Sequence, residues 1–117
     1  MKTTEITFGF DDIPNITIGH AKTFNTRRIV FDFSALKQRY GDGEFSLLYV
    51  KPSESEERPE EELTVPVVVT GTKAAWIVTD TDTAHSGTGE AECIYRGNKF
   101  CYKSNVFHVI VGRDIND

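Results

Sequence analysis

Residues 91–111, with the sequence AECIYRGNKFCYKSNVFHVIV, decide the fold. In an extended strand, successive side chains point to opposite faces, so alternation of residue types indicates a half-buried strand. The first part of the stretch alternates in this way, with three core-type residues two apart: Ala91, Cys93 and Tyr95. Gly97-Asn98 then gives the glycine-first signal of a two-residue hairpin turn. The segment from Val106 to Val111 is apolar at nearly every position and predicts the closing strand.

The same alternation recurs upstream and predicts further short strands. We expect strands within residues 5–8, 16–19, 28–33, 45–49, 63–69 and 74–78. Pro66 has no amide hydrogen to donate, so the strand that contains it should lie at a sheet edge or turn that position outward. The inward-facing set should be Ile29, Phe31, Phe33, Leu47, Val67, Trp76, Cys93 and Tyr95.

Two short helical turns are predicted between the strands. Ser34 is placed to cap a helix that runs through Tyr40 and ends at Gly41. The run Thr79-Asp80-Thr81-Asp82 puts a hydroxyl three residues before a carboxylate, which is a capping pattern, and Gly87 should end the turn that follows.

Composition agrees with the strand pattern. The β-branched and aromatic residues Val, Ile, Thr, Phe, Tyr and Trp number 45 of 117, whereas Ala, Leu, Met and Gln number 12, which is close to excluding a helical bundle. Short strands with turns every eight to twelve residues are typical of sandwiches. We therefore expect one all-β domain over residues 1–117, a two-sheet antiparallel sandwich with one or two short helical turns.

The net charge of −5 is concentrated in one segment. Six glutamates and one arginine between Pro52 and Glu62 carry all of it, so the rest of the chain is neutral. We interpret this segment as a solvated loop that is dispensable for folding; a docking site for a basic partner or a cation is the sharper alternative. A basic surface for nucleic acid is not evident. No apolar run approaches a membrane span or a signal peptide.

The candidate chemical groups do not add up to an enzyme. Ser86 and His85 are neighbours in the sequence, which does not make them part of a catalytic triad. Asp80, Asp82 and His85 could supply metal ligands, but helix capping explains the aspartates more simply. We therefore expect no catalytic residues, no metal and no cofactor.

The two cysteines should not form a disulfide. A two-residue Gly97-Asn98 turn would place Cys101 opposite Ile94 and Cys93 opposite Tyr102, so the two thiols would point to opposite faces of the sheet. Unbridged thiols suit a reducing compartment.

Several motifs resemble a known family. The stretches are residues 21–29, Phe31-Asp32-Phe33-Ser34-Ala35-Leu36, Tyr40-Gly41-Asp42-Gly43, and the pattern W-x-V-T-x-x-D-T that starts at Trp76 and is followed by Gly87 and Gly89. They are similar to the N-terminal module of upper baseplate proteins of tailed bacteriophages that infect Gram-positive bacteria. The likeness covers about residues 21–111. Asp82-Thr83-Ala84 before Cys93 also resembles a corner of immunoglobulin domains.

The resemblance implies an immunoglobulin-like sandwich that anchors part of a phage or prophage tail. It implies other tail or baseplate proteins as partners, a homo-oligomer, and a location in the virion after synthesis in the bacterial cytoplasm. Family members continue into a helical stalk and a distal domain, so a stand-alone tail protein and a fragment are both open. The alternative function is a carbohydrate- or host-surface-binding module, which would need an exposed aromatic platform.

An interface follows from apolar residues at outward positions. Ile77 should face away from Trp76, and Ile94 and Cys101 should oppose each other outside the hairpin. If their strands are neighbours, five residues form one apolar patch for self-association or docking: Ile77, Ile94, Cys101, His108 and Ile110. The alternative is that the turn after Thr79 or the N-terminal segment covers them.

Overall fold

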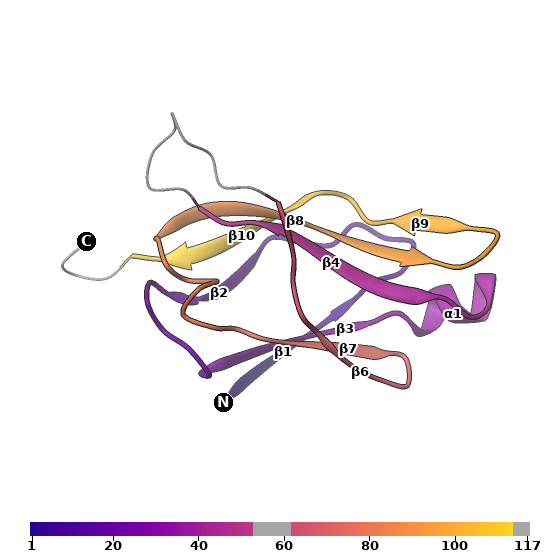
Figure 1. The fold of residues 1–117 in the computed structure, drawn as a ribbon, viewed down its shortest axis with the longest axis horizontal. Helices are drawn as coiled ribbons and strands as arrows, with labels where there is room; N and C mark the ends of the chain where they lie inside the picture. Colours follow the sequence, from indigo (N-terminus) through magenta and orange to yellow (C-terminus); the bar gives the residue numbers. More distant parts are fainter. Residues whose placement is uncertain (53–61, 114–117) are drawn as a thin grey trace.

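Two sheets pack face to face in this computed structural model, which describes residues 1–52 and 62–113 (Figure 1). The acidic stretch from Ser53 to Glu61 lies outside the described residues. In chain order the elements are β1 (Lys2–Thr7), β2 (Ile16–His20), β3 (Arg27–Asp32), α1 (Ser34–Tyr40), β4 (Glu44–Val50), β5 (Leu63–Thr64), β6 (Val68–Thr70), β7 (Lys73–Ile77), β8 (Gly87–Arg96), β9 (Cys101–Lys103) and β10 (Phe107–Gly112).

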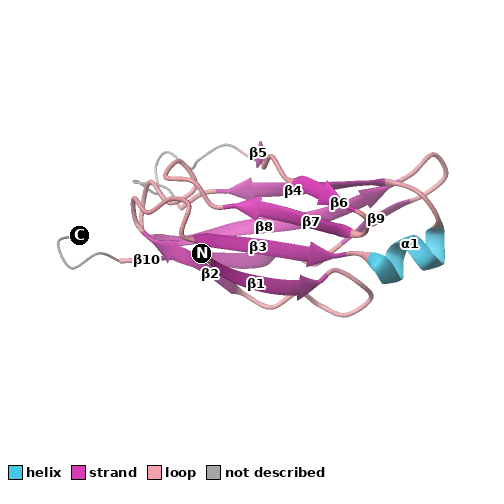
Figure 2. Ribbon diagram, turned by 90° about the horizontal axis from the view of Figure 1, so that it is seen from below, coloured by secondary structure: helices cyan, strands magenta, loops and turns pink. Residues whose placement is uncertain are grey.

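The predicted all-β sandwich is confirmed. One sheet has the strand order β1-β3-β7-β6, and the other has the order β2-β10-β8-β4-β5 with β9 also paired to β8. The four-stranded sheet lies below the six-stranded sheet in Figure 1 and in front of it in Figure 2. Most pairs are antiparallel, as expected, but β1 runs parallel to β3 and β2 runs parallel to β10. The first two strands therefore close one edge of each sheet.

The core forms where the inner faces of the two sheets meet. Seven of the eight predicted inward residues are buried, and Trp76 has no exposed surface. Val67, the eighth, is half-buried and packs against the margin of the core. Alternation of residue types is sufficient to find these positions because one face of each sheet is packed against the core and excludes water.

The strand predicted over residues 63–69 is wrong in its extent. Its first part, β5, pairs with β4 in the six-stranded sheet, and its last part, β6, pairs with β7 in the four-stranded sheet. Between them the chain crosses from one sheet to the other at the exposed Pro66, where the missing amide makes a continuous ladder impossible. Both halves lie at sheet edges, as the proline predicted.

The helix α1 has the predicted extent but a different cap. The amide of Ser34 donates to the Asp32 carboxylate at 2.9 Å, and Phe33 occupies the cap position without a side-chain cap bond. Gly41 ends the helix at φ 92°, a conformation that favours glycine. The carboxylate of Asp32, the last residue of β3, therefore replaces Ser34 as the group that orders the helix start.

The hairpin turn is displaced by one residue. Gly97 donates its amide to the Phe100 carbonyl at 3.0 Å, so the turn residues are Asn98 and Lys99. A Cβ at position 97 would come within 2.4 Å of the Phe100 ring and 2.8 Å of the Asp42 carbonyl. Close packing inside the ladder therefore requires glycine at position 97. The prediction that Gly97 is a turn residue is wrong.

No helix in the described part of the chain is both long and apolar enough to cross a membrane.

Candidate functional site

The five predicted interface residues do not form one patch. Ile77 lies on the outer face of the four-stranded sheet, because its neighbour Trp76 points into the core. The other four lie on the outer face of the six-stranded sheet, on the far side of the sandwich: Ile94, Cys101, His108 and Ile110. The assumption that β7 neighbours these strands is wrong, since β7 pairs with β3 and β6.

The pairing inside the hairpin also differs from the prediction. Ile94 lies opposite Lys103, and Cys101 lies opposite Arg96, because the turn is shifted. The shift moves the partner of each residue by two positions along the strand, so every side chain keeps its predicted face of the sheet. Cys93 is buried, Cys101 is exposed, and both are free thiols.

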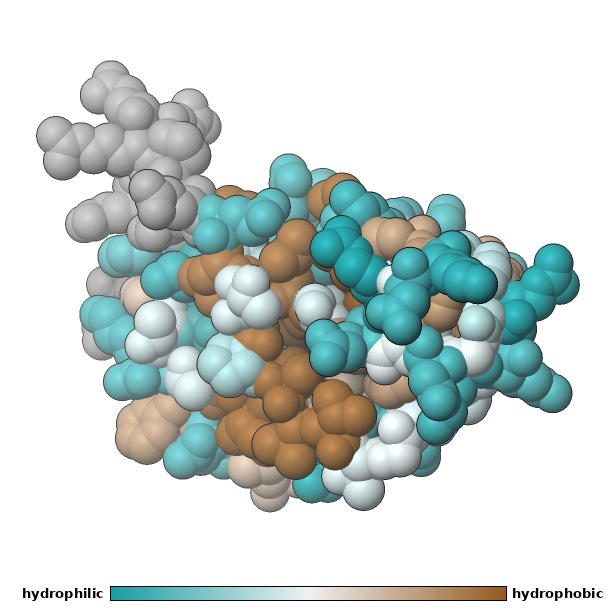
Figure 3. Space-filling view, turned by 45° about the vertical axis from the view of Figure 1, so that its right-hand side comes forward, coloured by the Kyte–Doolittle hydropathy of each residue, from teal (hydrophilic) through white to brown (hydrophobic). Residues whose placement is uncertain are grey.

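A hydrophobic groove borders the edge strand β6. It has a volume of about 430 Å³. One wall is the segment that crosses between the sheets, and the other is the outer face of β7 with the turn that follows it. Its lining residues include Leu63, Pro66, Val67, Val68, Ala75 and Ile77. Figure 3 shows a band of hydrophobic side chains on the face where this segment crosses, with hydrophilic residues on both sides.

The valines of β6 are unusually open to solvent. Val68 is 64% exposed and Val69 is 49% exposed, and β6 forms one edge of its sheet. Edge strands of monomeric proteins are commonly protected by charged residues or by bulges. β6 reads Val-Val-Thr and carries no charge. The groove and this edge form the first candidate site, and of the residues predicted for an interface only Ile77 lines it.

A second candidate site is an aromatic cluster at the end of the sandwich near α1. Tyr40 stacks on Phe100 at a centroid distance of 5.3 Å and meets Tyr102 at 5.9 Å. Phe10 contacts Tyr102 at 5.9 Å and is 56% exposed. Sequence reasoning missed this cluster because Phe10 and Tyr40 lie in a loop and at a helix end, outside the alternating strands.

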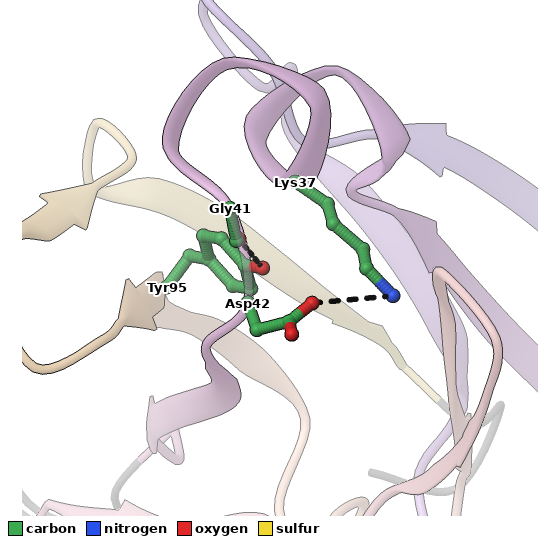
Figure 4. Close-up of polar contacts among 4 residues, drawn as sticks. All are labelled: Lys37, Gly41, Asp42 and Tyr95. Atoms are coloured by element: carbon green, nitrogen blue, oxygen red, sulfur yellow. Dashed lines mark hydrogen bonds and ion pairs between the residues drawn. The ribbon is translucent and has the colours of Figure 1, made fainter.

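Polar contacts fix the helix end beside this cluster. The Tyr95 hydroxyl donates to the Gly41 carbonyl, and Lys37 forms an ion pair with Asp42 at 3.7 Å (Figure 4). The Asp42 side chain is almost fully exposed, so this ion pair contributes little to stability.

The Asp80, Asp82 and His85 motif does not assemble into a ligand set. One oxygen of Asp82, Oδ2, accepts hydrogen bonds from the indole of Trp76 at 3.0 Å and from the amide and hydroxyl of Thr79 at 2.9 and 3.0 Å. Its carboxylate therefore has the predicted capping role. Across residues 1–52 and 62–113, no three or more His, Cys, Asp and Glu side chains lie close enough together to hold a metal ion.

Two buried groups have strongly altered acidity. Burial raises the pKa of the Tyr49 hydroxyl above its ordinary value, and the charge of Asp82 raises it further. Burial also raises the pKa of the Cys93 thiol, with a smaller contribution from Glu92. Both groups stay protonated at neutral pH, so Cys93 behaves as a core residue and not as a thiolate nucleophile.

No known family model matches this chain, and comparison with curated proteins finds no match either.

Proposed function

We propose that the protein is a non-catalytic structural component of a phage or prophage tail, where it acts as an assembly or anchoring module. The observation that carries this proposal is the hydrophobic groove beside β6. The resemblance in residues 21–111 gives the biological setting, and the groove gives a surface on which another tail protein would bind.

The groove suits a protein partner better than a small molecule. It is open along a sheet edge and continuous with the exposed Val68 of β6. An exposed apolar surface of this kind commonly marks a protein interface. Each buried Å² of such surface stabilises a complex by about 25 cal/mol before the costs of association.

The backbone of β7 adds a polar element to the groove. β6 pairs with β7 only as far as Ala75. The Val78 amide donates to the Arg27 carbonyl on the β3 side at 3.1 Å, and successive residues direct their backbone groups to opposite edges. The amide and carbonyl of Ile77 therefore point toward the groove. An extended partner segment would extend the sheet there.

The experiment is co-expression with the proteins encoded beside this gene, followed by size-exclusion chromatography with light scattering. We expect a defined complex with a tail or baseplate protein, and Val68→Lys should abolish it. Phe10→Lys is the matched control, because Phe10 is similarly exposed but lies at the α1 end. Neighbouring genes unrelated to tails, or a complex that Val68→Lys leaves intact, would overturn the proposal.

A carbohydrate- or host-surface-binding module is the second candidate function. The exposed aromatic cluster favours it, since sugar-binding proteins stack aromatic rings on the apolar faces of sugars. The rings of Phe10 and Tyr40 are 56% and 39% exposed.

Binding to purified bacterial cell-wall polysaccharide, measured by co-sedimentation, tests this candidate. The double variant Phe10→Ala, Tyr40→Ala should lose binding if the function is correct. Phe24→Ala is the control, because Phe24 is 57% exposed and lies in the loop between β2 and β3. Equal binding by both variants, or none by the unaltered protein, would exclude it.

A further inference from the structure

The outer edge of β6 presents backbone groups that are not bonded to β7. In an antiparallel sheet, successive residues of a strand direct their backbone groups to opposite neighbours. On the β3 side, the Thr72 carbonyl accepts a hydrogen bond at 2.9 Å and the Val78 amide donates one at 3.1 Å, so the even-numbered residues of this stretch face β3. Ala74 is one of them, and it lies opposite Val69. The amide and carbonyl of Val69 therefore point away from β7, toward the open edge of the sheet.

The other edge strands of the described chain are protected in ways that β6 is not. β1 carries the charges of Lys2 and Glu5, β9 carries that of Lys103, and β5 has only two residues. At β2, the Arg27 guanidinium donates to the Thr17 carbonyl at 3.3 Å. Charge, shortness and cover by side chains are common ways of preventing pairing at an edge. The uncharged and exposed β6 is therefore the edge best suited to pair with another strand.

A hollow borders this edge on the inner side of the sheet. The Val69 side chain is on the inner face, because it lies opposite the buried Ala74. With Phe33, Phe45 and Tyr95 it lines a hollow of about 300 Å³ next to the start of β4. Val69 is nevertheless 49% exposed. A strand placed beside β6 would cover Val69 and direct a side chain into the hollow.

The charged residues that line the hollow do not favour a charged partner. Lys37 and Asp42 pair with each other at 3.7 Å (Figure 4). Glu44 precedes the inward-facing Phe45, so its side chain points to the outer face of the six-stranded sheet. β6 itself carries no charge. A segment bound at this edge should therefore be uncharged where it meets Val69.

We propose that the edge of β6 binds one extended segment of another polypeptide, with an apolar central residue that faces the hollow. The inference goes beyond the proposed function, because it uses the open edge and inner face of β6, whereas the groove lies on the outer face. In an antiparallel pair, the residue opposite Val69 exchanges both backbone hydrogen bonds with it, and the two side chains lie side by side. The backbone bonds supply affinity, and the hollow selects the side chain.

The shape of the molecule favours a single segment over a second copy of the chain. Figure 2 shows β5, which belongs to the six-stranded sheet, beyond β6 on this side of the sandwich. β6 therefore lies in a step between the two sheets. Two copies paired edge to edge through β6 would bring their projecting six-stranded sheets together, whereas one extended segment fits beside β6 in the step.

Amide hydrogen exchange, followed by nuclear magnetic resonance on the isolated chain, tests the proposal. The Val69 amide should exchange fast in the free protein, whereas those of Val68 and Thr70, which face β7, should be protected. The probe is a blocked seven-residue peptide with leucine at its centre, two threonines on either side and lysine at both ends. At about 1 mM, it should slow exchange of the Val69 amide at least about fivefold, which corresponds to a dissociation constant of roughly 0.2 mM or less.

Two altered peptides leave the protein unchanged and separate backbone pairing from side-chain contact. A peptide with N-methylated leucine cannot donate to the Val69 carbonyl and should give no protection. A peptide with glutamate in place of leucine keeps the backbone bonds but should bind at least about fivefold more weakly, because the carboxylate loses water beside an apolar surface.

Val69→Pro removes the edge amide from the protein itself. It should stay folded, because the Val69 amide makes no bond to β7, and should bind the leucine peptide at least about fivefold more weakly. Val69→Thr is the matched control, since it keeps the amide and the branched shape and should bind within about twofold of the unaltered protein. Thermal unfolding followed by circular dichroism verifies that both variants are folded.

Three results would overturn the inference. They are a Val69 amide that is already protected in the free chain, equal binding of the leucine and N-methylated peptides, and no change of Val69 exchange with about 1 mM peptide. Protection that appears together with self-association would assign the edge to a second copy instead. Peptide binding needs no tail protein, and Val69→Pro leaves Val68 and Ile77 of the groove unchanged, so this result and the co-expression result can fail independently.

Discussion

The two ends of the sandwich are closed by different kinds of contact. At the end beyond β7, hydrogen bonds from both sheets converge on Asp82: the Trp76 indole donates to its carboxylate, and the Tyr49 hydroxyl donates to its carbonyl at 3.0 Å. At the α1 end, rings cover the core through several overlapping contacts, among them Tyr40 with Phe100 and Phe10 with Tyr102. One substitution at Asp82 removes all the hydrogen bonds that meet there. Loss of one ring at the α1 end leaves other rings that still cover the core. The Asp82 end should therefore be far more sensitive to single substitutions.

Trp76→Ala should have the largest effect. The side chain is fully buried between the sheets, contacts Tyr49 at a centroid distance of 5.3 Å, and anchors Asp82. Removing it leaves a cavity and should lower the free energy of unfolding by about 3–5 kcal/mol. Urea denaturation followed by far-ultraviolet circular dichroism measures this loss. A loss below about 1 kcal/mol would contradict the fully buried position of Trp76.

Asp82→Ala should rank second. Three donors lose their acceptor, and the buried Trp76 indole is left without a partner, so we expect a loss of about 3 kcal/mol. Asp82→Asn keeps an acceptor oxygen and should lose about half as much. Urea denaturation of both variants gives the ranking. Equal stability of Asp82→Ala and the unaltered protein would show that the Asp82 end is not organised by this residue.

The alternation of residue types identified the core at both ends, but it did not identify what closes them. Capping at Thr79–Asp82 could be predicted because its spacing is local. The bond from Tyr49 to Asp82 spans 33 residues and depends on how the sheets pack. Likewise, the pairing order that separates Ile77 from Ile94 is a property of the whole fold. The displaced turn at Asn98-Lys99 depends on where the Phe100 ring packs, which no local pattern records.

Alkaline pH should destabilise the protein through Cys93 and Tyr49. Their ordinary pKa values are 9.0 and 10.0, and burial raises the pKa of each in the folded state. The unfolded chain therefore releases these protons first, so stability is complete below about pH 9 and falls as pH rises above it. Urea midpoints between about pH 8 and pH 10.5 measure the fall. Cys93→Ala should delay its onset, and an unchanged pH profile for that variant would contradict the assignment.

Phe10→Ala should have the smallest effect. Phe10 is 56% exposed, and Tyr40 and Tyr102 remain to cover the core. We expect a loss of less than about 1 kcal/mol, because little apolar surface returns to water. Thermal unfolding of Phe10→Ala and of the Asp82 variants compares the stability losses at the two ends directly. A loss as large as that of Asp82→Ala would show that the aromatic end depends on single residues as well.

The parallel pairing of β2 with β10 has a consequence for synthesis on the ribosome. Ile16 pairs with Val109, and the Ile13 amide bonds to Asn105, a residue 92 positions later. Each partner of β2 is thus translated long after β2 itself has left the exit tunnel. Contacts between residues so far apart in sequence form slowly, and until they form the unpaired strand can pair incorrectly with other chains. The nascent chain must keep Ile16 and Ile18 from other chains until β10 has been translated.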